Sequence, residues 1–369
     1  MINNLKKIGL PFILISFILF LFTSYTLKNF QLFLISTLNF FILLYYFKIL
    51  NENLLITIFS FLIIVTFIET TLFLSNNQSL LKKKVNQSLH IKNIKTNLGY
   101  QPHSGIQKHK LYKNDKLIFD KDYTILNTNY RYTPRLNKKT KSQQINFFGG
   151  SFTFGWGLSD DETLPYFSQK FFTNSLINNY AINGFGVHQV YTQIKYSKNL
   201  IGDINILVTF NNHIPRSSCK RDFSIGSPRY ILYENKIERK GWCGSTLLGN
   251  YKIIDFFIRI INKSEIKKLI DKAFFRKNLF DNKSTELYLA LINEINNLLI
   301  KKNKKFYVGY ISNGEKLDFR IIDFFKKNEI NFFDLSLDST DKKNSIFLDG
   351  HPTKLANIRR AKIIHKNIN

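Results

Sequence analysis

The sequence predicts an α/β protein with a parallel sheet, preceded by a membrane segment and a small β element. Three observations support this prediction. From residue 145 onward, strand-like and helix-like segments alternate, an order typical of a parallel sheet covered by helices on both faces. Three long apolar runs lie within residues 1–81. Between these two parts, two strand-like runs flank a turn-like triplet at 113–115, a pattern that indicates a hairpin.

The composition excludes several classes of protein. The chain has 369 residues, of which 44% are hydrophobic, too many for a wholly disordered chain. Its two cysteines are too few for a disulfide scaffold or a four-cysteine metal site. The net charge of +27 suggests nucleic acid or anionic lipid as a partner. The lysines form no single stripe and no nucleic-acid motif is present, so we expect no nucleic-acid partner.

The apolar runs at 8–27, 30–50 and 54–75 predict three transmembrane helices. A helix of 20 residues is about 30 Å long, the thickness of a bilayer core. A removable signal peptide is the alternative for the first run, but no small-x-small cleavage site follows it. Glu69 lies inside the third run. It is either a functional group in the membrane, or a carboxylate that lies near the membrane surface or pairs with a neighbouring helix.

The basic residues Lys6 and Lys7 favour a cytoplasmic N-terminus. Three crossings then place residues 82–369 outside the cytoplasm, so we expect a multi-pass protein of the inner (plasma) membrane with its large domain on the periplasmic side. The lysines at 82–84 favour the opposite orientation, but long domains translocate largely regardless of charge.

Cys219 and Cys243 flank a hairpin-like stretch at 230–238. A disulfide between them would fit an oxidising compartment. Two unrelated free thiols are the alternative.

The predicted domains are a membrane domain at 1–81, a linker with the small β element at 82–142, and the α/β body at 143–369. In such a body, ligands bind beyond the carboxyl ends of the strands. The expected strands are at 145–148, 204–210, 305–311 and 331–335, and the expected helices are at 164–172, 250–300, 318–327 and after Pro352.

The residues at 147–157, FFGGSFTFGWG, place Ser151 after a strand and two glycines. A serine beside uncovered backbone N–H groups is what acyl transfer requires, namely a nucleophile next to an oxyanion site. Thr153 replaces the second glycine of the G-x-S-x-G elbow, and the Lys-Ser/Thr ending of a P-loop is missing. A glycine turn with a capping serine is the structural alternative.

Further polar groups follow other expected strands or precede the last helix. Asp349 and His351 lie in a loop before the final helix, and a carboxylate can hold an imidazole in the tautomer that accepts a serine proton. Gly184 can offer an uncovered N–H group. Asn211 or Asn212 can donate a side-chain amide at the end of a strand.

Taken in this order along residues 143–366, these blocks resemble the SGNH (GDSL-type) hydrolase superfamily, and within it bacterial membrane-anchored members with a GGSFTFG serine block. The resemblance implies a three-layer α/β/α fold. It also implies that Ser151 is the nucleophile and His351 the base, with Asp349 orienting the base. The sequence itself suggests no metal, because His103, His109 and His213 have no ligand spacing between them, and we expect no cofactor.

The resemblance further implies an oxyanion hole. Its donors would be the backbone N–H groups of Ser151 and Gly184 and the side chain of Asn212. Asn211 and His213, the neighbours of Asn212, are the alternative third donors.

Three positions depart from the family pattern. Gly150 replaces the Asp of the Gly-Asp-Ser block, and residues 210–213 are Phe-Asn-Asn-His in place of Gly-x-Asn-Asp. One residue, where many members have two, separates Asp349 from His351. The loss of one oxyanion donor typically lowers the rate by about 10²–10³-fold.

The expected function is therefore hydrolysis of an acyl ester, of a cell-envelope glycan or lipid, by a membrane-anchored serine esterase or deacylase. An O-acyltransferase that uses the same site, with a membrane partner protein, is one alternative. A catalytically decayed module that binds a glycan or lipid is the other.

Overall fold

The structure is a computed structural model, and the chain divides into two compact units. One comprises Met1–Lys84 and Ser245–Asn278, and the other comprises Val85–Gly244 and Leu279–Asn369. The described residues are 52–76, 90–113, 116–136, 142–221, 224–244, 264–270, 279–338, 340–345 and 350–368, together with Thr37 and Phe41.

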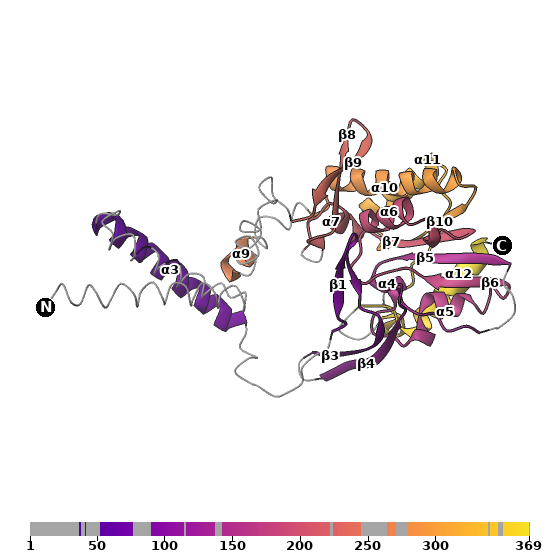
Figure 1. Cartoon of the computed structure of the whole chain (residues 1–369), viewed down its shortest axis with the longest axis horizontal. Helices are drawn as coiled ribbons and strands as arrows, with labels where there is room; N and C mark the ends of the chain where they lie inside the picture. Colours follow the sequence, from indigo (N-terminus) through magenta and orange to yellow (C-terminus); the bar gives the residue numbers. More distant parts are fainter. Residues whose placement is uncertain are drawn as a thin grey trace. The chain divides into compact units, whose positions relative to one another are not determined.

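The second unit is built on a five-stranded sheet with the strand order β11-β10-β7-β5-β6 (Figure 1). Every neighbouring pair in this sheet is parallel. Parallel strands whose two faces are both buried favour continuous apolar runs, and β7 is buried along its whole length. The strands are β5 (Gln143–Gly149), β6 (Ser175–Asn179), β7 (Ile204–Phe210), β10 (Lys305–Ile311) and β11 (Phe332–Asp334).

Helices cover both faces of this sheet, which gives three layers. The apolar side chains of α6, α10 and α11 pack in one core against β5, β7 and β10. Those of α5 and α12 pack in a second core on the other face. The prediction of an α/β fold with a parallel sheet is therefore confirmed. The covering helices are α5 (Leu164–Ser168), α6 (Val187–Tyr196), α10 (Asn282–Ile300), α11 (Lys316–Lys327) and α12 (Lys354–Ile368).

Two antiparallel hairpins precede the sheet in the chain, where the sequence predicts a small β element. Asn114 and Asp115, two residues of the predicted turn, lie outside the described residues. Tyr123 and Ile125 of the second hairpin pack with Phe154 and Ala181 in a small core of their own, so this hairpin lies against the loop that follows β5. The strands are β1 (Asn93–Thr96), β2 (Gly99–Pro102), β3 (Gly105–Lys113) and β4 (Lys116–Ile125).

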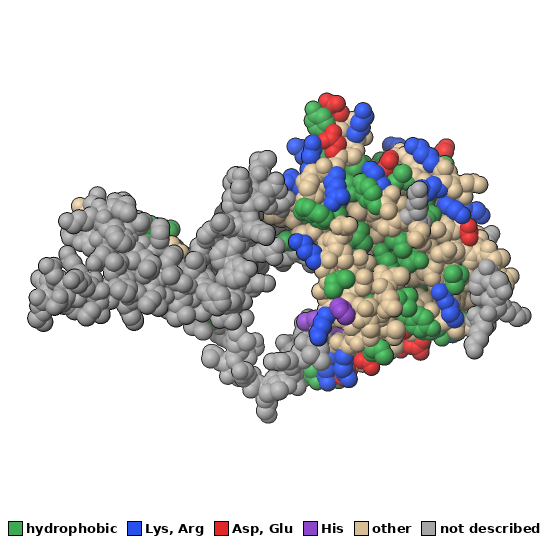
Figure 2. All heavy atoms as spheres, viewed as in Figure 1, with side chains coloured by type: hydrophobic (Ala, Val, Ile, Leu, Met, Phe, Trp, Pro, Cys, Tyr) green, Lys and Arg blue, Asp and Glu red, His purple; other side chains and the backbone are tan. Residues whose placement is uncertain are grey.

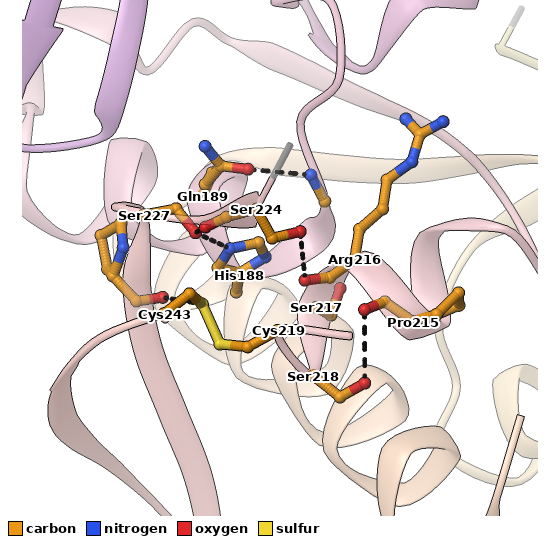
Figure 3. Close-up of a disulfide and its surroundings, with 12 residues drawn as sticks. His188, Gln189, Pro215, Arg216, Ser217, Ser218, Cys219, Ser224, Ser227 and Cys243 are labelled. Carbon is orange, nitrogen blue, oxygen red and sulfur yellow. Dashed lines mark hydrogen bonds between the residues drawn. A yellow bond between two sulfur atoms is a disulfide. The ribbon is translucent and has the colours of Figure 1, made fainter. Parts of the chain in front are cut away.

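A disulfide joins Cys219 to Cys243, with a Cα–Cα distance of 5.2 Å (Figure 3). It links the chain just beyond the short helix α7 (His213–Ser217) to the end of an antiparallel hairpin, β8 (Pro228–Tyr233) and β9 (Lys236–Trp242). Of the two states that the sequence leaves open for these cysteines, the structure has the bonded one. Cross-linking of this kind restricts the unfolded chain and so favours the folded one.

The first unit contains α3 (Glu52–Asn76) and α9 (Glu265–Ile270). The carboxylate of Glu69 is buried and accepts hydrogen bonds from the backbone N–H groups of Glu265 and Ile266, at 2.5 and 3.0 Å, and from the hydroxyl of Ser264, at 2.9 Å. A carboxylate at this end of a helix satisfies N–H groups that have no partner within the helix. Of the two roles considered for Glu69, pairing with a neighbouring helix is the one observed.

The structure does not support the transmembrane prediction for residues 54–75. These residues form α3, but no helix formed by the described residues is long and apolar enough to cross a membrane. Residues 8–27, and residues 30–50 apart from Thr37 and Phe41, lie outside the described part of the chain.

The described surface carries no single basic stripe on the face in Figure 2. Lys and Arg side chains are dispersed there among Asp and Glu, with hydrophobic side chains between them. Several of the basic side chains pair with carboxylates, for example Lys110 with Asp120 at 3.1 Å and Lys304 with Asp203 at 2.8 Å.

Candidate active site

Ser151 lies at the carboxyl end of β5, as the first residue of the short helix α4 (Ser151–Phe154). The turn into this helix requires glycine. Gly149 has a φ of 145°, and a Cβ atom there would lie 2.7 Å from the carbonyl oxygen of Val208. The first N–H groups of a helix have no partner within it. The backbone therefore presents the N–H of Ser151 beside its own side chain.

The structure brings His351 to Ser151 across 200 residues of sequence. Nε2 of His351 lies 2.9 Å from Oγ of Ser151, the hydrogen-bond distance expected of a nucleophile and its base. Pro352, the residue after His351, forms an antiparallel bridge with Ser345, which holds this loop before α12 begins. Asp349, which the sequence analysis pairs with His351, lies outside the described residues.

Aromatic side chains surround the imidazole of His351. Its ring centroid lies 5.4 Å from that of Phe152 and 5.8 Å from that of Trp156. Phe152 in turn stacks on Phe210, the last residue of β7, with 4.8 Å between centroids. Ser151 itself is 3% exposed. A site with apolar walls and little water strengthens electrostatic interactions with a reacting group.

The buried guanidinium of Arg131 holds the loop that follows the serine. It donates to the carbonyl oxygens of Phe154 and Gly155, at 2.8 and 2.6 Å, and to that of Leu158, at 2.5 Å. Nε of Arg131 pairs with Asp160 at 3.0 Å. The last carbonyls of a helix lack intrahelical acceptor bonds and carry partial negative charge, so a cation here stabilises the end of α4.

The block after β7 places its three polar residues in different surroundings. Asn211 is buried, and its amide donates to Glu315 at 3.3 Å. Asn212 is exposed. His213 is buried, and its Nε2 lies 2.9 Å from the point where a Cβ atom on Gly150 would be. Gly184 has a φ of 83°, in the turn after β6.

Two buried histidines flank this region. The pKa of His188 is lowered to about 3 by burial. The pKa of His213 is held well below its usual value by burial and then by the positive charge of Arg216. Nε2 of His188 is 2.8 Å from Oγ of Ser227 (Figure 3). Both imidazoles are therefore neutral at pH 7.

Among the described residues, no group of three or more His, Cys, Asp or Glu side chains is arranged to hold a metal ion. His109, for example, lies against Tyr123 on the β3–β4 hairpin, with Nδ1 2.8 Å from the phenol oxygen.

The sequence analysis missed Arg131 and the aromatic residues Phe152, Trp156 and Phe210. No local pattern in the sequence indicates that the guanidinium of Arg131 is buried. Aromatic residues make up 15% of the chain, so a single Phe or Trp in the sequence gives little indication that it lines a site.

Replacement of Arg131 by Met should lower the free energy of unfolding by about 3–5 kcal/mol, because it leaves a partly buried Asp160 carboxylate and several carbonyls without their cation. Arg135→Met is the matched control. Arg135 is exposed and donates to the carbonyl of Ile177, so its loss should cost only about 1 kcal/mol. Urea unfolding followed by circular dichroism measures both, and equal losses in the two variants would contradict the role given to Arg131.

The two neutral histidines predict a loss of stability in acid. An unfolded histidine takes up a proton below about pH 6.5, whereas folded His188 does so only near pH 3. Protons therefore favour the unfolded chain between these values, and each buried histidine should lower the free energy of unfolding by about 1.4 kcal/mol per pH unit as the pH falls. Urea unfolding at pH 7.5, 6.0 and 5.0 measures the slope. His188→Gln should remove one such contribution, and an unchanged slope in this variant would contradict the assignment.

Among known proteins, this chain is similar to solved structures, two of them at low sequence identity. No family model matches this chain, and no curated protein matches it. One solved structure is of a protein described as lipolytic and of the G-D-S-L family, from Desulfitobacterium hafniense DCB-2. It is 10% identical, has a TM-score of 0.35, and the match covers 61% of this chain and 99% of that one. Another, from Veillonella parvula DSM 2008, is described as a member of the lipolytic G-D-S-L family. It is 11% identical, has a TM-score of 0.37, and the match covers 61% and 97% of the two chains.

Proposed function

We propose that this protein is a serine hydrolase that cleaves an acyl ester through Ser151 and His351. The observation that carries the proposal is the 2.9 Å contact between Oγ of Ser151 and Nε2 of His351. This contact lies at the carboxyl end of β5, an interior strand of the parallel sheet, and ligands bind at this end of the strands in such sheets. The adjacent helix start supplies a backbone N–H group for an oxyanion.

The chemistry follows from this geometry. Oγ of Ser151 attacks the ester carbonyl carbon while its proton passes to Nε2 of His351. The tetrahedral intermediate then collapses, the bond to the alcohol oxygen breaks, and the imidazolium returns its proton to that leaving group. Water attacks the resulting acyl-enzyme with His351 again as the base, and the acid is released as Ser151 recovers its proton. In this mechanism Asp349 orients His351.

A location outside the cytoplasm, on a membrane anchor, belongs to the same proposal. The disulfide between Cys219 and Cys243 supports it, because such bonds persist in oxidising compartments and are rare in the cytosol. The uncharged run at 8–27 and the run at 30–50 supply the apolar length that an anchor requires. An ester of a cell-envelope glycan or lipid is the substrate class that fits this location.

The location predicts how the protein fractionates. Expressed in a bacterium from its full-length gene, it should remain in the membrane pellet after a carbonate wash. In that fraction Cys219 and Cys243 should resist alkylation until a reductant is added, as read by peptide mass. A cytosolic protein whose two thiols alkylate without reduction would contradict the location and leave the hydrolase assignment to be tested on its own.

The nucleophile is tested with the full-length protein in mild detergent. Wild type should hydrolyse short-chain nitrophenyl esters and form a covalent adduct with a fluorophosphonate. Ser151→Ala should lose the adduct, and both Ser151→Ala and His351→Ala should lower kcat by at least about 10³-fold. Ser142→Ala is the matched control, because Ser142 is exposed and immediately precedes β5, at the opposite end of the strand from Ser151.

The outcomes separate the candidate functions. Labelling at Ser151 with slow hydrolysis that an added sugar alcohol accelerates would identify an acyltransferase that uses the same acyl-enzyme. A folded protein that neither turns over an ester nor forms the adduct would overturn catalysis and favour a glycan- or lipid-binding module. Labelling that persists in Ser151→Ala would place the nucleophile elsewhere.

A further inference from the structure

His213 has a buried ring nitrogen that points toward the nucleophile. Nε2 has no hydrogen-bond partner among the described residues, and it lies 2.9 Å from the Cβ position of Gly150. A Cβ position lies roughly 3 Å from the backbone nitrogen of the next residue, which here is the nitrogen of Ser151. Nε2 of His213 and the N–H of Ser151 are therefore close enough for one oxygen atom to accept from both.

The other ring nitrogen of His213 ends a short buried chain of hydroxyl groups. Nδ1 lies 2.9 Å from Oγ1 of Thr209, and the same hydroxyl lies 3.0 Å from the phenol oxygen of Tyr288. Thr209 is the only hydrogen-bond partner of the Tyr288 hydroxyl among the described residues. All three side chains are buried, and buried donors normally have an acceptor.

Only one direction of donation along this chain gives every hydroxyl proton an acceptor. If Tyr288 donates to Thr209, then Thr209 donates to Nδ1 of His213, and the ring proton resides on Nε2. Each direction leaves one donor without an acceptor among the described residues. That donor is Nε2–H of His213 in the first direction and the phenol O–H of Tyr288 in the reverse one. Of these two donors, only Nε2–H lies beside Gly150, where a substrate oxygen can accept from it, whereas the phenol O–H would stay without an acceptor. A bound oxygen therefore favours the tautomer of His213 whose N–H faces Gly150.

We propose that His213 is the third donor of the oxyanion hole, through Nε2–H, and that Thr209 and Tyr288 are positioning residues that set its tautomer. The inference rests on the proposed function, because it assigns a role in stabilising the tetrahedral oxyanion formed on Ser151. His213 thus takes the place that the sequence gives first to Asn212, whose side chain is exposed. A preorganised donor aimed at the developing charge accelerates acyl transfer.

The surroundings suit a neutral donor beside an anion. Burial, and then the positive charge of Arg216, keep the pKa of His213 well below its usual value, so the imidazole stays neutral at working pH. Nη1 of Arg216 lies 3.0 Å from the same Cβ position of Gly150, and its charge also favours a developing oxyanion. In Figure 3 the side chain of Arg216 extends away from the disulfide.

The test combines kinetics with nitrogen NMR on the full-length protein. His213→Ala should lower kcat by about 10²-fold with little change in KM. His213→Gln, whose amide can place an N–H near the position of Nε2, should recover part of that loss. Thr209→Val removes the hydroxyl that donates to Nδ1 of His213. It should therefore shift the ring proton from Nε2 toward Nδ1, as read by ¹⁵N-histidine spectra, and should lower kcat. A fluorophosphonate adduct on wild type should shift the Nε2 resonance of His213.

His188→Gln is the matched control. His188 is also a buried histidine with a hydroxyl partner, but the proposal gives it no part in the reaction, so its kcat should equal that of wild type. Labelling at Ser151 together with full activity in His213→Ala, or an Nδ1–H tautomer in wild type, would overturn this inference and leave the proposed function standing. Absence of both turnover and labelling in the folded wild type would overturn the two together.

Discussion

The position of Ser151 depends on one buried cation. Helix α4 has only four residues, so its carbonyl groups have few partners of their own. Arg131 binds three carbonyls in and after this helix and pairs with Asp160, while Asn179 donates to the carbonyl of Thr153. The ring of Tyr123, from the β3–β4 hairpin, lies 4.1 Å from the guanidinium carbon. The hairpin before the sheet is thus part of the support of the serine loop.

The opposite wall of the site depends on a helix that is equally short. Helix α7 has five residues and carries His213 and Arg216. Its far end is held by the disulfide at Cys219, and the hydroxyl of Ser224 donates to the carbonyl of Arg216 at 3.1 Å (Figure 3). Because a cross-link restricts the unfolded chain, oxidation of the two cysteines favours the arrangement that presents His213 to Gly150. Formation of this disulfide and assembly of the site are linked in this way.

Some elements of the fold could be predicted because their signal is local. Strands β7 and β10 have the bounds that their apolar runs predict.

The sequence of strand β6 and that of helix α6 show no comparable apolar run. β6 is an edge strand with the sequence SLINN, and asparagine is depleted in strands. The buried face of α6 includes His188, Gln189 and Gln193. Gln189 is satisfied by the carbonyl of Leu98, 91 residues away, so its burial cannot be inferred from periodicity.

The sequence by itself determined the turn before Ser151, because two adjacent glycines after an apolar strand permit a sharp turn whatever packs around them. It also identified His351 as a candidate partner of Ser151. Only the tertiary structure decided that Nε2 of His351 lies against Oγ of Ser151, that Glu69 binds the start of α9, and that His213 rather than Asn212 lies next to Gly150. Each of these depends on a contact between segments distant in sequence, or on which of several adjacent side chains is buried. The spacing of residues in the sequence determines neither the long-range contacts nor which neighbouring side chain is buried, because both are fixed only when the elements pack together.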